Sequence, residues 1–378
     1  MNRKIGSIIT GFIFFVILIL VLFLNLIIPD KESSMEENRM LQTLPSFSVS
    51  KYADGRFEKK MNDYFNDQFF LRKALIKVKT AFDLSAGKLE SNGVYFGKNH
   101  YLIEELTTPD PANLKKTENG LMRFRKKHRK LKMYFMLVPN AGSILKENVP
   151  GSVPLDDQNP HMDAFFRSAK KAGFVTIDVR GTLKKAARQK QIFYRTDHHW
   201  TTDGAYEAYR YACRSMKLGK ATGYTLLAVK NDFLGTLASK SGFTNGRCDE
   251  IRIAQPNSKK HKPSVVFYAD TKKRTTSFYQ LKSLKEKDAY AVFGGSNHPM
   301  YTIETPVKSS RRLLLIKDSY ANCFVPFLTQ HFREIVVIDP RYYFENINKL
   351  IKNEQITDVL FLYNANTFFE DRSLPMML

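Results

Sequence analysis

The chain has few cysteines, and this shortage limits the classes of protein to which it can belong. Its 378 residues include 3 cysteines, Cys213, Cys248 and Cys323, which allow at most one intramolecular disulfide and lack the spacing of a metal-binding motif. Cys213 and Cys323 fall on the apolar faces of expected helices, so we expect buried free thiols there. The sequence therefore specifies neither a disulfide framework nor a cysteine metal site, and it contains no internal repeat.

Acidic residues are also scarce relative to basic ones. The chain has 37 acidic against 59 basic residues, which gives a formal net charge of +22 at pH 7. Such a surplus favours anionic partners such as nucleic acid, acidic glycopolymers or phospholipid headgroups, and a basic surface that serves only solubility is an equal alternative. The hydrophobic content of 43% is enough for one large core or two smaller ones, so the chain is globular rather than disordered.

An apolar run near the N-terminus decides which of these partners the chain can meet. Residues 5–28 form the run, and about 20 such residues span a bilayer as a helix. Arg3 and Lys4 precede it and acidic residues follow it, so the positive-inside rule places the rest of the chain outside the cytoplasm. A cleaved signal peptide is the alternative, but the run exceeds a usual signal core and no small-residue cleavage site closes it. We therefore expect an uncleaved anchor in the cell membrane and no contact with nucleic acid.

The rest of the chain divides by composition. We expect a cytoplasmic tip and transmembrane anchor in residues 1–30, a polar, acidic stalk in 31–50, and an extracytoplasmic domain in 51–378. Aromatic residues at helical spacing within 57–84 predict a core helix or a helix that clasps the domain. Residues 223–310 are rich in Lys, Thr and Ser, and we expect them to form an insertion that carries β-hairpins.

Strand-like and helical segments alternate in the remainder of the domain. Apolar runs predict strands at 133–138, 174–179, 192–195, 312–316, 335–338 and 359–363. Helical patterns lie between most of them, at 162–172, 204–216, 320–332 and 344–352. This alternation is typical of an α/β fold in which helices cover both faces of a parallel sheet.

One loop between an expected strand and helix concentrates acid–base groups. Asp197, His198 and His199 lie there, and imidazole is the side chain best suited to moving protons near neutral pH. Candidate N-caps for the next helix follow at residues 201–203. The carboxyl edge of the sheet, where such a loop lies, is where open α/β sheets bind ligands.

Ser319 lies at a second junction of the same kind. There an aliphatic strand ends and a helix is expected to begin, so backbone amides and the positive helix end favour a developing negative charge. That position suits a serine nucleophile with part of an oxyanion hole, provided that an oriented base activates the hydroxyl. An ordinary helix-capping serine is the alternative.

Four motifs carry a resemblance to a known family, and they lie at residues 37–41 (Glu-Asn-Arg-Met-Leu), 64–69 with Arg72, 197–200 (Asp-His-His-Trp) and 317–320 (Lys-Asp-Ser-Tyr). With these motifs the chain resembles the DHHW family of membrane-anchored bacterial proteins, which is similar to SGNH-like proteins that O-acetylate alginate. The resemblance implies an SGNH-hydrolase-like fold in which Asp197 orients His199, the general base for the nucleophile Ser319. His198 takes the variable middle position, where it packs or binds a polar neighbour.

The sequence departs from the SGNH pattern at two places. The nucleophile block usually begins Gly-Asp-Ser, whereas Lys317 precedes Asp318 here. The glycine and asparagine donors of the oxyanion hole are assigned to Gly295, Asn297 and Asn364, although a Gly-Gly-Ser-Asn run is often only a turn.

Two other functions compete with acyl transfer. A two-metal phosphoesterase would use Asp197 with Asp178 and Asp203, but the Asp-x-Asp partner motif is missing. The second is a non-catalytic basic module that binds cell-wall polyanions. We expect instead an acyl-ester hydrolase or O-acyltransferase that uses Ser319, His199 and Asp197 on an anionic or acylated cell-surface glycan. This mechanism requires no cofactor or metal, and a membrane protein that exports acyl groups is a further expected partner.

Overall fold

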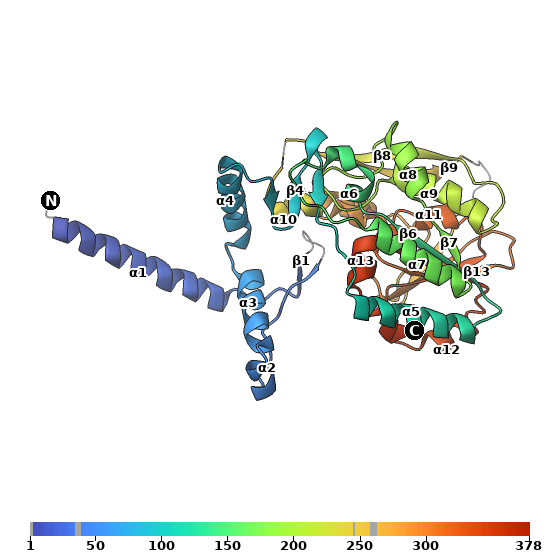
Figure 1. The fold of residues 1–378 in the computed structure, drawn as a ribbon, viewed down its shortest axis with the longest axis horizontal. Coiled ribbons are helices and arrows are strands. Elements are labelled where there is room, and N and C mark those ends of the chain that lie inside the picture. Colours follow the sequence, from blue (N-terminus) through green and yellow to red (C-terminus); the bar gives the residue numbers. More distant parts are fainter. Residues whose placement is uncertain (1–2, 35–38, 245, 258–262, 296) are drawn as a thin grey trace. The chain divides into compact units, whose positions relative to one another are not determined.

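The computed structural model describes residues 3–34, 39–244, 246–257, 263–295 and 297–378 (Figure 1). The chain forms two compact units, one of Met1–Lys88 with Ser239–Phe243 and one of Leu89–Ala238 with Thr244–Leu378. The acidic pair Glu36 and Glu37 and Asn38 of the expected stalk lie outside the described residues, as does Ser296 of the glycine-rich loop. The division into anchor, stalk and domain at residues 30 and 50 stays a prediction.

The N-terminal unit is largely helical. Its elements are α1 (Arg3–Ile27), β1 (Ser33–Ser34), β2 (Arg39–Met40), α2 (Val49–Ala53), α3 (Arg56–Gln68) and α4 (Arg72–Ser85). Residues Ile5–Ile27 of α1 are long and apolar enough to cross a membrane, and none of that stretch is buried within the structure. A signal sequence near an N-terminus meets the same criterion, so length and composition support membrane anchoring or export.

The aromatic stripe of residues 57–84 is half-buried to exposed, with Phe57, Met61 and Phe69 half-buried. The pattern is interrupted between α3 and α4, and no residue of α3 is buried in the part of the chain that the structure describes. Phe65 on α3 is 63% exposed and Leu75 on α4 is 52% exposed. Helical periodicity gathers apolar side chains on one face, and among the described residues that face is left half-buried to exposed.

A mixed sheet of eight strands forms the centre of the larger unit, within the described residues. Its order is β11-β10-β12-β14-β13-β15-β6-β7. The strands are β6 (Lys132–Val138), β7 (Val175–Ile177), β10 (Val265–Tyr268), β11 (Arg274–Thr275), β12 (Met300–Glu304), β13 (Arg312–Lys317), β14 (Glu334–Ile338) and β15 (Asp358–Asn364). The pairs from β14 to β7 are parallel, whereas β12, β10 and β11 are added antiparallel. The expected parallel sheet is thus found from β14 to β7, and part of the 223–310 insertion extends its edge with antiparallel strands, which makes the whole sheet mixed.

Helices cover both faces of this sheet, because alternate side chains of each strand point to opposite sides. In β6, Tyr134 and Met136 enter one apolar cluster, and Met133 and Phe135 enter the other. Figure 1 shows α8 and α9 on one side of the strands and α5 and α12 on the other. The helices are α5 (Pro111–Lys127), α6 (Ala141–Ile144), α7 (Asn159–Lys171), α8 (Arg180–Ala187), α9 (Thr202–Ser215), α11 (Val325–Leu328), α12 (Ile347–Asn353), α13 (Ala365–Glu370) and α14 (Leu374–Met377).

Smaller elements border the sheet. They are the strands β3 (Glu90–Ser91), β4 (Val94–Phe96) and β5 (Leu102–Glu104), the hairpin of β8 (Tyr224–Phe233) and β9 (Asp249–Pro256), the helix α10 (Thr236–Ser241), and the 3₁₀ helices η1 (Lys98–His100), η2 (Lys146–Asn148), η3 (Leu281–Lys285), η4 (Ala289–Val292) and η5 (Ser319–Ala321). The β8–β9 hairpin confirms the expected hairpin within the insertion.

Two predicted elements are wrong and the thiol prediction is confirmed. Residues 192–195 make only an isolated bridge, and the expected helix over 320–332 is reduced to η5 and α11. Pro326 stands in the first turn of α11, so the helix cannot run through from Ser319 without losing a backbone hydrogen bond. Cys213 and Cys323 are free and buried, as expected, and Cys248 is free and exposed.

Candidate active site

The Asp-His-His-Trp segment lies on a short loop that closes on itself. The Tyr194 amide donates to the carbonyl of His199 at 3.2 Å, and the Thr201 amide donates to the carbonyl of Ile192 at 2.9 Å. These bonds use backbone N–H and C=O groups that a strand would pair with a neighbouring strand. The apolar residues of this segment therefore do not join the sheet. The Thr201 hydroxyl then accepts the Gly204 amide at 3.2 Å and caps α9, which holds the end of the loop.

The structure brings Asp197, His199 and Ser319 into one hydrogen-bonded line. Nδ1 of His199 lies 2.6 Å from Oδ1 of Asp197, and Nε2 lies 2.8 Å from Oγ of Ser319. All three residues are buried. With its Nδ1 proton donated to the carboxylate, His199 presents the lone pair of Nε2 to the serine hydroxyl.

Asp197 is held by the segment that follows β8. Its Oδ2 accepts the Thr236 amide at 2.8 Å and the Thr236 hydroxyl at 2.9 Å, and its Oδ1 also accepts the His199 amide at 2.9 Å. Burial alone would raise the pKa of Asp197, but the two neighbouring histidines and these donors hold it below its ordinary value. The carboxylate is therefore ionised and fixed, as the orienting group of a serine nucleophile must be.

Gly235 allows this segment to approach Asp197. A Cβ atom added at Gly235 would lie 2.2 Å from Cβ of Asp197 and 2.4 Å from its Oδ2. Real Cβ atoms do not make such contacts, so any larger residue at 235 displaces Asp197 or the segment itself.

Asp249, the first residue of β9, anchors the loop on its other side. Its Oδ1 accepts the Arg195 amide at 2.9 Å, and its Oδ2 accepts the amide and hydroxyl of Thr196, both at 2.7 Å. Thr236, Gly235 and Asp249 all lie in the segment expected to be a peripheral insertion, and no motif in the sequence pointed to a role for them. Their signal in the sequence is weak, because each contacts the loop across 39 or more residues.

Ser319 follows β13 directly, at the carboxyl edge of the sheet. Asp318 caps the turn by accepting the Tyr320 amide at 2.9 Å, and its other oxygen accepts the backbone and side-chain amides of Asn364 at 2.8 and 2.6 Å. Burial raises the pKa of Asp318 to about 6 despite these donors. Among the residues that the structure describes, none accepts a hydrogen bond from the Ser319 amide, which leaves that donor available for an oxyanion.

The residues beside His199 and Ser319 join the two loops. Nε1 of Trp200 donates to the carbonyl of Tyr320 at 2.8 Å, and the Tyr320 hydroxyl donates to the carbonyl of His198 at 2.5 Å. Together with the His199–Ser319 contact, these bonds fix the spacing of His199 and Ser319 from both sides.

An aromatic ring covers one face of His199. The ring of Tyr290 stacks on that of His199, with centroids 3.9 Å apart and planes 11° apart, and its hydroxyl donates to the Ser319 carbonyl at 3.3 Å. Burial and the neighbouring His198 lower the pKa of His199 to about 4, although Asp197 opposes the shift. His199 is thus neutral at pH 7 and able to accept a proton.

The other predicted site residues have different surroundings. Nδ1 of His198 lies 2.6 Å from the Thr236 hydroxyl, a polar neighbour of the kind expected for it. The Asn364 side-chain amide donates to Asp318 and to Thr367, and so supports the turn that carries Ser319. In the loop of residues 294–298, the Gly295 amide donates to Ala291 at 2.9 Å, and the Asn297 amide donates to the Tyr342 hydroxyl at 3.3 Å. No described contact joins Gly295 or Asn297 to Ser319, so their oxyanion role stays a prediction.

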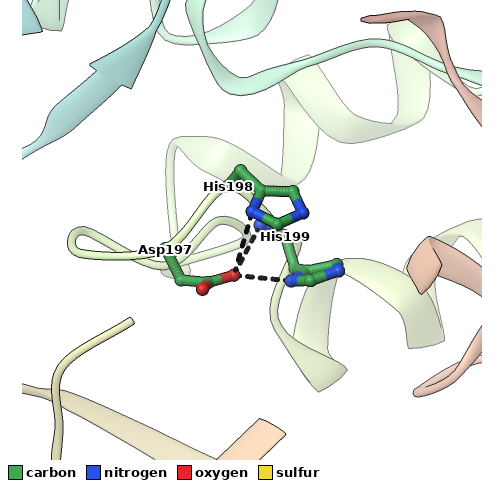
Figure 2. Close-up of side chains that lie close together, drawn as sticks. All are labelled: Asp197, His198 and His199. Carbon is green, nitrogen blue, oxygen red and sulfur yellow. Dashed lines mark hydrogen bonds and ion pairs between the residues drawn. The ribbon is translucent and has the colours of Figure 1, made fainter. Parts of the chain in front are cut away.

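Asp197, His198 and His199 each offer a ligand atom, and these atoms lie within 4.8 Å of one another. Figure 2 shows the three side chains close together. The atoms are already engaged, because Asp197 accepts the bonds described above and Nδ1 of His199 points at its carboxylate. The carboxylates considered as additional ligands are paired elsewhere, Asp178 with Arg180 and Asp203 with Arg252. This donor set fits a proton relay better than the several carboxylates of a two-metal centre.

Comparison with known proteins shows that part of the chain is similar to SGNH-like proteins. Residues 94–267 match the family model described as an SGNH hydrolase-like domain of the acetyltransferase AlgX. This range includes the Asp-His-His loop and ends before Ser319. The probable alginate O-acetylase AlgJ of Pseudomonas syringae is 24% identical over 174 residues, and the Pseudomonas aeruginosa protein is 23% identical over 174 residues. The match spans 44% of this chain and 44% of each relative, so the chain spans less than half the length of the curated relatives that it matches.

Solved structures share the fold over a larger part of the chain. A DHHW family protein from Eubacterium siraeum superposes with a TM-score of 0.63 and 24% identity, covering 76% of this chain and 95% of that one. PatB1 of Bacillus cereus, solved with a sulfonyl adduct, gives a TM-score of 0.60 and 19% identity over 71% of this chain and 94% of its own. At these identities the likeness shows the fold. The resemblance predicted from the four motifs is thus confirmed, and the chain is similar in sequence to the AlgX and AlgJ proteins and in fold to a DHHW family protein.

Proposed function

We propose that the protein is an O-acetyltransferase that acts on a cell-surface glycan outside the cytoplasmic membrane. The line from Asp197 through His199 to Ser319, with contacts of 2.6 and 2.8 Å, is the observation that carries this proposal. The similarity to the probable alginate O-acetylases supports acetyl as the group transferred and a polysaccharide as its acceptor. The apolar helix α1 supports attachment to the membrane.

The first half of the reaction forms an acetyl-enzyme. His199 Nε2 accepts the proton of the Ser319 hydroxyl while Oγ bonds to the acetyl carbonyl carbon of the donor, and the Ser319 amide donates to the resulting oxyanion. The tetrahedral intermediate then breaks its bond to the donor oxygen, which leaves with the proton from His199. Asp197 stabilises the imidazolium in both steps without taking the proton.

The second half moves the acetyl group to the acceptor. A sugar hydroxyl gives its proton to His199 and attacks the acetyl carbonyl carbon, and the bond to Ser319 Oγ breaks as the proton returns to that oxygen. Water in place of the sugar gives hydrolysis, so transfer requires an acceptor that is held close to the acetyl-enzyme.

Mass spectrometry of the full chain in detergent tests the nucleophile. After incubation with an activated acetyl ester, we expect an acetyl adduct on the peptide that contains Ser319. The adduct is lost in Ser319→Ala and strongly reduced in His199→Ala, whereas Ser168→Ala, in helix α7, serves as the matched control and labels normally. Equal labelling in all four proteins, or no labelling of the parent chain, contradicts the proposal.

A further inference from the structure

A charged cluster lies at the ends of the two strands beside the nucleophile. Strands β13 and β14 are parallel, and their register pairs Ile316 with Ile338, so Lys317 and Asp339 leave the sheet side by side. Nζ of Lys317 lies 3.5 Å from Oδ2 of Asp339. Arg341 lies two residues after Asp339, as Ser319 lies two residues after Lys317.

Arg341 is the member of this cluster that reaches solvent. Its Nε and Nη2 donate to the two oxygens of Asp339 at 2.8 and 2.6 Å, a bidentate contact that fixes the guanidinium plane. The Arg341 side chain is 31% exposed, whereas the side chains of Asp339 and Lys317 are 0% and 3% exposed. No acceptor for Nη1 of Arg341 is found among the described residues, which leaves one edge of the guanidinium open to a ligand.

Asp339 and Arg341 stay charged although the cluster is largely buried. Burial opposes ionisation of both partners, yet the ion pair holds the pKa of Asp339 below and that of Arg341 above their ordinary values. Burial also lowers the pKa of Lys317, which the Asp339 carboxylate offsets in part. The lysine that stands where SGNH proteins have glycine therefore helps to hold Asp339, and it is too deeply buried to touch a substrate.

The charge of Arg341 acts on the catalytic groups themselves. It lowers the pKa of His199, after the larger effects of burial and His198, and it opposes the rise in the pKa of Asp318. The loop of residues 294–298 meets the same region, since the Asn297 amide donates to the hydroxyl of Tyr342. Arg341 thus follows the strand that lies beside β13, and its charge reaches the groups next to Ser319.

We propose that Arg341 is the acceptor-recognition residue of this site and binds a carboxylate or phosphate group of an anionic glycan through its open guanidinium edge. The inference rests on the proposed function and adds the substrate class to it. A fixed guanidinium recognises both anions by two parallel hydrogen bonds, and it would hold the neighbouring sugar hydroxyl toward the acetyl-enzyme. The basic surplus of the chain, +22 at pH 7, favours approach of such a polyanion.

Binding is tested separately from chemistry in the Ser319→Ala background, with the full chain in detergent. Titration calorimetry is run with a uronic acid oligosaccharide, a polyol phosphate oligomer and a neutral oligosaccharide of the same length. We expect one of the two anionic ligands to bind most tightly, and that ligand identifies the source of the anion. Adding Arg341→Gln should weaken its binding roughly tenfold to a hundredfold, as expected for loss of a charge-assisted contact.

Two further variants separate recognition from folding and from net charge. Arg341→Lys keeps the charge without the planar fork and should restore only part of the affinity. Arg333→Gln removes the same charge from the opposite end of β14, where Arg333 is exposed, and should bind like the parent. Equal affinity for the neutral and anionic ligands, or equal losses in Arg341→Gln and Arg333→Gln, overturns the inference.

Acetylation of Ser319 by an activated ester shows which proposal has failed. Labelling of the parent chain without a preference for anionic acceptors refutes the role of Arg341 and leaves the acetyl-enzyme proposal intact. Absence of labelling together with binding that depends on Arg341 refutes the transferase and leaves an anion-binding site. In labelling experiments, Arg341→Gln should also move the acidic limb of the pH profile to higher pH, since the charge of Arg341 lowers the pKa of His199.

Discussion

Replacing Gly235 by alanine should inactivate the site while leaving the fold intact. The new Cβ would lie 2.2, 2.4 and 2.7 Å from Cβ, Oδ2 and Cγ of Asp197. Because the nearest of these atoms is the Cβ of Asp197 and not the far end of a flexible side chain, rotation of the carboxylate alone does not relieve the clash. Either Asp197 moves away from His199 or the 235–236 segment moves away from Asp197.

The size of the effect follows from which contacts are lost. Overpacking of this kind costs about 1–3 kcal/mol of the free energy of unfolding. Loss of the oriented acid in serine triads lowers kcat by a factor of roughly 10,000. We therefore expect kcat to fall by about 1,000-fold or more, with a decrease in Tm of only several degrees.

The assay compares initial rates of hydrolysis of an activated acetyl ester with thermal unfolding followed by circular dichroism. Gly181→Ala is the matched control, since a Cβ at Gly181 meets nothing within 4 Å and alanine favours helix α8. A Gly235→Ala protein with the kcat of the parent would show that the activity does not depend on close contact between Asp197 and the 235–236 segment. A protein that loses kcat and most of its stability together would show that the clash disrupts the whole fold rather than the position of Asp197 alone.

Three further results follow from the same contacts. Thr236→Val removes the hydroxyl bond to Asp197 but keeps the amide bond, so kcat for the ester should fall about tenfold, and Thr236→Ser should restore it. The pKa of His199 is lowered to about 4 and the base must be neutral, so log(kcat/KM) should stay level from pH 7 to 5 and fall only near pH 4; a limb at the ordinary imidazole value contradicts this. Asp249→Asn replaces a carboxylate oxygen with an amide group whose hydrogens face the donors of Arg195 and Thr196, so the free energy of unfolding should fall by about 2–4 kcal/mol in chemical denaturation. An unchanged denaturation midpoint would show that Asp249 does not anchor the loop.

The local pattern of the sequence was sufficient for the strands that lie in the parallel part of the sheet. Runs such as 133–138 and 335–338 are apolar on both faces because helices cover both sides, and a short run of this kind is typical of a buried strand. The pattern failed for residues 192–195, whose apolar side chains are buried but whose backbone pairs within its own loop. Periodicity indicates which side chains are buried, but it does not indicate with which groups the backbone of the segment forms hydrogen bonds.

The residues of the candidate site that stand in a recognisable motif could be predicted from the sequence. The residues that support them through long-range contacts could not. Asp197, His199 and Ser319 stand in recognisable motifs, and the structure brings them together. Lys317 was visible as a departure from the expected glycine, but its partner Asp339 is supplied by another strand. Support of this kind depends on tertiary register, which a single sequence does not reveal.

The bond between Trp200 and Tyr320 gives the protein a built-in optical reporter. Trp200 is the chain's one tryptophan, it is fully buried, and it stands next to His199. Emission excited in the indole band therefore arises from a single side chain that joins the loop of His199 to the loop of Ser319. A change in its wavelength or quenching on acetylation, substitution or heating would report on the assembly of this site alone, without any label attached to the protein.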